Sequence, residues 1–178
     1  MVKKVEKEGI RMAKEQIILK MADFYEGNLE DINHFLKVHA FAATIGALER
    51  LDEDTLDILE IASIVHDIAC PLCREKYGDT DGKHQEAESE PLLREFLKEF
   101  RLPDSVEERV IFLVTHHHSY SHVEGMDYQI LLETDYLVNA GESAKYRKSL
   151  EQFRKNVFRT KTGLHLLDSL YPDRSSIL

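Results

Sequence analysis

Apolar residues recur three and four positions apart along most of the chain, and this spacing predicts helices. No stretch alternates apolar and polar residues over the length of a strand. The expected helices span about 5–24, 31–50, 54–69, 85–100, 104–117, 127–140, 143–157 and 164–170. The pattern therefore predicts an all-α protein, a compact helical bundle forming one domain over residues 1–178.

Residues that cap or break helices set the expected boundaries. Asn28 and Asp31 are N-cap candidates for the second helix, and Pro71 is expected to help end the third. The stretch 70–83 contains several glycines and aspartates, so it is predicted to be a loop.

Composition narrows the possible functions. The 178 residues are 43% hydrophobic and 31% charged, a balance typical of folded globular proteins. No apolar run approaches the roughly 18 residues of a membrane span, and the charged N-terminus lacks an apolar signal core. We therefore expect a cytoplasmic protein without a membrane partner.

The formal net charge of −10 disfavours binding to long nucleic acid, because such binding depends on clustered Lys and Arg. A small anionic substrate is compatible with this charge if bound metal supplies positive charge locally.

The two cysteines, Cys70 and Cys73, form a CxxC motif. A redox role would need a βαβ context and a zinc site would need a second ligand pair, and the sequence offers neither. We expect both residues to pack a loop.

Polar residues in apolar helical surroundings are the strongest functional signal. His66 and Asp67 close an apolar helix, where an unpaired acid is costly to bury. His39 and Asp135 lie in apolar stretches of two other predicted helices. These residues also have interpretations without a functional role. His39 would be a hydrogen-bonded core histidine, and the His-Asp pair would interact with the end of its helix. Taken together, two imidazoles and two carboxylates make a mixed N/O set that suits Mn²⁺, Fe²⁺ or Co²⁺.

The order His39, His66-Asp67, Asp135 on successive helices resembles the HD-domain superfamily of metal-dependent phosphohydrolases. The resemblance covers residues of about 31–140 and implies an HD-domain helical bundle. Within this superfamily, the chain resembles the symmetrical diadenosine tetraphosphate hydrolases, which have a small domain of similar kind. The GlyTyrPro signature of the branch that degrades cyclic di-GMP is absent, so that activity is not expected.

The same resemblance implies a second metal site. It assigns His84 and His116 as further ligands and Asp67 as the carboxylate that bridges two divalent ions, chosen from Fe, Mn, Co, Ni, Mg and Zn. His117 is then a further ligand or a substrate contact, and spacing alone does not separate it from His116. Surface or outer positions are left for His34, His118 and His122.

The implied activity is hydrolysis of a small phosphorylated substrate, a nucleotide or related molecule, by metal-activated water. With a single metal, His117 or Glu133 would serve as the base. The candidate phosphate contacts are Arg74, Lys76 and Lys83. Two alternatives stay open: an HD-fold protein that binds metal or nucleotide without turnover, and a di-iron oxygenase. The oligomeric state is left open.

Overall fold

Helices make up the fold of this protein, whose computed structural model describes residues 2–172, with side chains described from residue 13 onward. The ends of the predicted 1–178 domain thus lie outside the described residues. The helices are α1 (Val2–Phe24), α2 (Leu29–Leu48), α3 (Glu53–Val65), α4 (Cys70–Tyr77), α5 (Gly82–Leu97), η1 (Lys98–Phe100), α6 (Asp104–His116), α7 (Met126–Glu142), α8 (Ala144–Arg147), α9 (Leu150–Asn156) and α10 (Lys161–Leu170). The all-α prediction is confirmed, since residues 2–172 contain no strand.

The segment predicted as a loop over 70–83 instead contains α4. Pro71 lies in the first turn of this helix, where the missing N–H costs nothing because it would have no partner within the helix. Gly78 ends α4 with a φ of 78°, a left-handed conformation that glycine adopts without a Cβ clash. Since α3 ends at Val65, His66 and Asp67 belong to the turn that joins α3 to α4.

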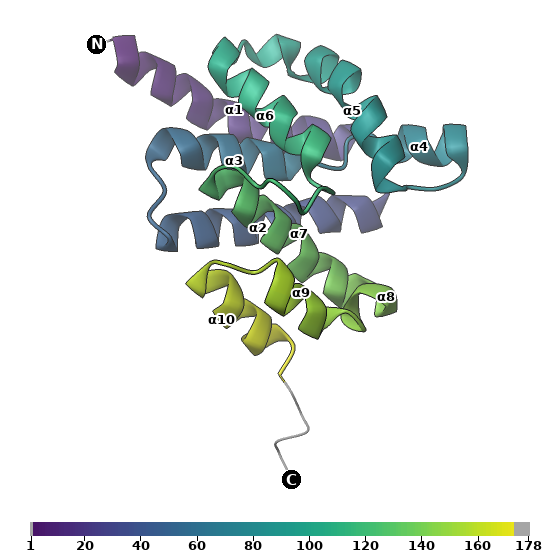
Figure 1. Ribbon diagram of the computed structural model, residues 1–178. Helices are drawn as coiled ribbons and strands as arrows, with labels where there is room; N and C mark the ends of the chain where they lie inside the picture. Colours follow the sequence, from purple (N-terminus) through teal and green to yellow (C-terminus); the bar gives the residue numbers. More distant parts are fainter. Residues whose placement is uncertain (1, 173–178) are drawn as a thin grey trace.

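The predicted helix over 143–157 is also divided in the structure, into α8 and α9. Both short helices follow the end of α7, and α9 lies beside α10 at the lower end of the molecule in Figure 1.

The core is built around α2, α3 and α7, which all pack against one another. Helix α6 packs on α3, α5 packs on α6, and α1 lies along α3 (Figure 1). Fully buried side chains such as Phe35, Leu59 and Ile130 fill the space between these helices. Each contributes roughly 1.5–3 kcal/mol by burial. Among the described residues, no helix is both long and apolar enough to cross a membrane.

Two buried tyrosines fix the turns that follow α3 and α6. The hydroxyl of Tyr25 donates to the backbone oxygen of Asp67 at 3.0 Å. The hydroxyl of Tyr128 lies 2.6 Å from the backbone oxygen of His116 and 2.7 Å from that of Ser119. These contacts set the backbone from which the histidine side chains described below project.

Glu133 holds the segment between α9 and α10. Its carboxylate accepts hydrogen bonds from the backbone N–H groups of Arg159 at 2.6 Å and Thr160 at 3.0 Å, and from the Thr160 hydroxyl at 2.5 Å. Burial raises the pKa of Glu133 despite these hydrogen bonds. Glu133, expected from the sequence as a possible base, thus lies in a structural contact and does not line the cavity described below.

Candidate metal centre

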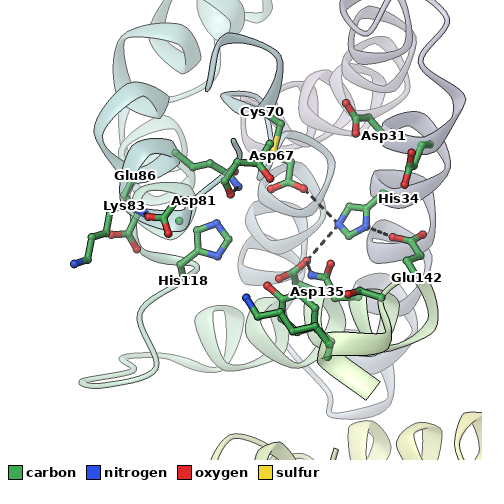
Figure 2. A pocket seen from close by; sticks show the side chains of 18 of the residues that line it. Asp31, His34, Asp67, Cys70, Asp81, Lys83, Glu86, His118, Asp135 and Glu142 are labelled. Carbon is green, nitrogen blue, oxygen red and sulfur yellow. Dashed lines mark hydrogen bonds and ion pairs between the residues drawn. The ribbon is translucent and has the colours of Figure 1, made fainter. Parts of the chain in front are cut away.

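Four side chains from three parts of the chain meet at one place between the helices. Figure 2 shows three of them, His34, Asp67 and Asp135. His34 comes from α2, His66 and Asp67 from the turn after α3, and Asp135 from the middle of α7. The Nε2 atoms of His34 and His66 are 3.2 Å apart. Each lies 3.3–3.5 Å from a carboxylate oxygen of Asp67 and of Asp135. Two ring nitrogens and two carboxylate oxygens therefore surround one point.

The hydrogen bonds on the far side of the rings determine which nitrogen is left with a lone pair. His34 places Nδ1 2.7 Å from the carboxylate of Glu142, and His66 places Nδ1 2.8 Å from the backbone oxygen of Ser63. Both partners are acceptors, so each Nδ1 carries the proton. The two Nε2 atoms therefore face each other and the two carboxylates, and a proton or a metal ion between them would relieve the repulsion of their lone pairs.

The electrostatics of the cluster also favour a cation. Burial opposes a charge on His34, yet hydrogen bonds to Asp135 and Glu142 raise its pKa to about 11. Desolvation likewise opposes a charge on the half-buried Asp67, but the neighbouring His66, His117 and His34 hold its pKa well below the ordinary value. Burial also opposes a charge on Asp135, but hydrogen bonds from His34 and His66 lower its pKa. Both carboxylates in the cluster are thus ionised at neutral pH and attract positive charge.

A second group shares Asp67 with the first and includes His117 and His118. The Nε2 of His117 lies 3.5 Å from a carboxylate oxygen of Asp67, while its Nδ1 donates to the backbone oxygen of Val114 at 2.7 Å. The Nε2 atoms of His117 and His118 are buried and have no hydrogen-bond partner among the described residues. Burial lowers the pKa of His118 to about 4, so its ring is neutral and able to bind a metal.

This donor set fits divalent ions. Imidazoles held in place through Nδ1, together with ionised carboxylates, suit Mn²⁺, Fe²⁺, Co²⁺ and similar metals, and binding of an ion would displace any proton from Nε2. The hydrogen bonds to Glu142, Ser63 and Val114 orient the rings in the way that outer contacts orient metal-binding histidines. One ion would be held by His34, His66, Asp67 and Asp135, and a second by Asp67, His117 and His118.

The cluster opens into a cavity of about 890 Å³ between α2, α4, α5 and the α7–α9 region. Acidic side chains outnumber basic ones on its walls, and the basic ones are Arg74, Lys83 and Lys145. Of the predicted phosphate contacts, Arg74 is already paired with Asp31, and Lys83 lies on the wall at the start of α5. Lys76 pairs with Glu88 at 2.5 Å and does not line the cavity.

His39 does not join the cluster, and this corrects the expectation from the sequence. Its Nε2 lies 3.4 Å from Glu60, which also pairs with Lys14 at 2.9 Å. His34 precedes His39 by five residues, which on a helix is a rotation of about 140° and a rise of about 7.5 Å. The sequence carried a signal for His34: it lies four residues before Val38 and eight before Ala42, on the buried face of α2.

His84 and His116 also lie elsewhere than predicted. His84 stacks on Tyr77 and places Nδ1 2.9 Å from Asp79, with a side chain that is 38% exposed. His116 is exposed, stacks on Phe112 and bonds to its backbone oxygen at 2.8 Å. Their expected places in the second group are taken by His117 and His118, and His118 is partly buried rather than a surface residue.

Comparison with known families bears on the same region. Residues 31–152 match the family model described as HD domain. The matched stretch begins at α2 and ends within α9, so it contains every member of both histidine groups. No curated protein matches the chain.

Proposed function

The chain belongs to the HD domain family, and on this premise we propose that it is a metal-dependent phosphohydrolase. Its proposed substrate is a phosphate ester or anhydride of a nucleotide or related small molecule. The observation that carries the proposal is the convergence of lone pairs from His34, His66, Asp67 and Asp135 on one point beside an open cavity. This arrangement supports a metal site, because a divalent ion would interact with all four donor atoms at once.

Some residues of the site are proposed to bind metal, and others orient the metal-binding side chains. Asp67 belongs to both groups and is the proposed bridge between two ions. Glu142 and the backbone oxygens of Ser63 and Val114 keep the imidazole protons on Nδ1. When bound, the ions supply an acidified water as nucleophile and neutralise charge on the phosphoryl oxygens.

The cavity supports a small substrate. Its volume of about 890 Å³ lies within the range of ligand pockets, roughly 300–1,000 Å³. Its acid-rich wall would repel a phosphorylated molecule if bound metal did not reverse the local charge. We propose Lys83 as a phosphate contact, because it lines the cavity and is not among the paired cations described above. Arg74 could contribute only by exchanging its contact with Asp31.

The proposal is tested with metal-depleted protein refilled with Mn²⁺ or Fe²⁺ under reducing conditions. Phosphate release is measured from p-nitrophenyl phosphate, nucleoside monophosphates and diadenosine tetraphosphate. We expect metal-dependent release from at least one of these, and a loss of about 10²-fold or more in Asp67→Asn. Asp57→Asn is the matched control, because Asp57 pairs with Lys14 and does not line the cavity. Unchanged turnover in Asp67→Asn would refute the proposal.

The two rival functions give different results in the same assay. Hydrolysis consumes water and no oxygen, so the rate should be equal with and without air once the metal is kept reduced. An oxygen-dependent loss of substrate would favour a di-iron oxygenase. Tight binding of metal and nucleotide without any phosphate release would favour a binding protein.

A further inference from the structure

Three buried side-chain atoms lack a hydrogen-bond partner among the described residues, and two of them are the Nε2 atoms of His117 and His118. The third is the amide oxygen Oε1 of Gln85, a residue only 3% exposed. Gln85 lines the same cavity as Asp67 and His118. An unpaired amide oxygen is unfavourable to bury, so this atom also requires a partner.

The hydrogen bond of the amide nitrogen fixes the orientation of the Gln85 side-chain amide. Its Nε2 donates to the backbone oxygen of Thr80 at 3.1 Å. Exchanging the two ends would place the amide oxygen against that carbonyl oxygen, with no proton between them. The unpaired atom is therefore the oxygen, and it can be satisfied only by a cation or by a hydrogen-bond donor.

The first turn of α5 packs directly on His118, and Gln85 lies on that turn. A Cβ at Gly82 would approach the His118 ring to 2.7 Å, so the backbone there is in close contact with the ring. Gln85 follows Gly82 by three residues and shares its helix face. Glu86, on the next position, accepts a hydrogen bond from the Ser119 hydroxyl at 3.2 Å. Figure 2 shows Lys83 and Glu86 of this turn beside His118.

We propose that Gln85 supplies a neutral oxygen ligand to the second ion, alongside Asp67, His117 and His118. The inference rests on the proposed function, because it assumes that this second group holds a metal. A single cation would satisfy the lone pairs of both orphaned ring nitrogens and of the orphaned amide oxygen. An amide oxygen is a hard ligand, so it favours Mn²⁺ or Mg²⁺ over softer ions at this position.

The test compares Gln85→Leu, which removes the oxygen, with Gln85→Glu, which keeps one at the same reach. Ser89→Ala is the matched control, since the Ser89 hydroxyl bonds to the Gln85 backbone oxygen on the same helix. Metal-free full-length protein is titrated with Mn²⁺. Calorimetry measures the binding of each ion, and electron paramagnetic resonance detects the signal of a coupled manganese pair. Thermal unfolding in EDTA verifies that each variant is folded.

We expect wild type, Gln85→Glu and Ser89→Ala to bind two Mn²⁺ ions and to give the coupled signal. Gln85→Leu should bind the first ion normally and the second about 10-fold or more weakly. Wild-type affinity for the second ion in Gln85→Leu would overturn the inference, as would equal weakening in Gln85→Leu and Gln85→Glu. A wild type that binds one ion overturns both this inference and the two-ion form of the proposed function. A protein that binds both ions as expected but releases no phosphate would support the Gln85 ligand and overturn the hydrolase.

Discussion

Helix α2 carries both His34, which lies in the cluster, and His39, which does not, so the two residues can be compared by mutation. We expect His34→Ala to lose most of its affinity for the first metal ion, and His39→Ala to retain it. His34 places its Nε2 3.2–3.5 Å from the donor atoms of His66, Asp67 and Asp135. His39 contacts Glu60 at 3.4 Å, and Lys14 remains to compensate that carboxylate.

The expected size of the effect follows from the number of ligands. Four-ligand sites of structural zinc bind with about 10–16 kcal/mol, so one ligand accounts for roughly 2.5–4 kcal/mol. Because about 1.4 kcal/mol corresponds to a tenfold change in affinity, His34→Ala should lower the affinity for the first ion by on the order of 10²- to 10³-fold. Loss of the ring also leaves Glu142 without the imidazole that it orients, although Lys37 still contacts it at 2.5 Å.

The assay is a Mn²⁺ titration of metal-free protein, with metal content after gel filtration as a second measurement. Both variants are compared with wild type at one pH and one ionic strength. Equal affinities in His34→Ala and wild type, or a loss confined to His39→Ala, would refute the geometry on which the account is built.

Further predictions concern orientation, stability and pH. Glu142→Ala should weaken Mn²⁺ binding by about 10- to 100-fold, because His34 loses the acceptor for its Nδ1 proton; an unchanged titration curve would contradict this. Glu133→Ala should lower the free energy of unfolding in urea by roughly 3 kcal/mol, since Arg159 and Thr160 lose their acceptor, while activity per folded molecule stays close to wild type. Burial raises the pKa of Glu60, but hydrogen bonds from His39 and Lys14 outweigh it and lower the pKa. Its stabilisation should therefore be complete above pH 4.5, the ordinary value, and should decline as pH falls through the lower folded pKa, which a pH series of wild type against Glu60→Gln will measure. Saturation with Mn²⁺ at about 100 times its Kd should raise the melting temperature by roughly 5–10 °C over protein in EDTA, and an unchanged melting temperature would argue against binding to the folded state.

Local spacing was sufficient to predict the helical core. The buried residues of α2 and α3 recur at helical intervals, and their faces could be read directly from the sequence. Helix α4 was missed because the glycines and aspartates that follow it dominated the composition of the segment. Pro71 was interpreted as a stop, whereas it opens α4.

The ligand set was harder to predict, because the rotation of each helix decides which residue faces inward. His39 was chosen for its immediate neighbours, although residues four apart share a helix face. His116 and His117 both follow apolar residues at three and four positions, so spacing could not separate them. Contacts of Tyr128 with the backbone at the end of α6 accompany the inward turn of His117, and they join two helices across the loop between them rather than residues of one helix.

The start of α5 shows the same limit. Residue type favoured His84 as a ligand, but the close contact of Gly82 with His118 fixes the register of the helix. That register places Gln85 on the cavity wall, while His84 lies against Tyr77 and Asp79. No local pattern in the sequence specifies this contact.

Anomalous diffraction from a crystal of the Mn²⁺-loaded protein, recorded at the manganese edge, tests the central claim most directly. The account predicts a peak within about 2.0–2.3 Å of the Nε2 atoms of His34 and His66, with Asp67 and Asp135 completing the set. A cluster without manganese density at saturating Mn²⁺, or a peak beside His39 and Glu60 instead, would contradict it.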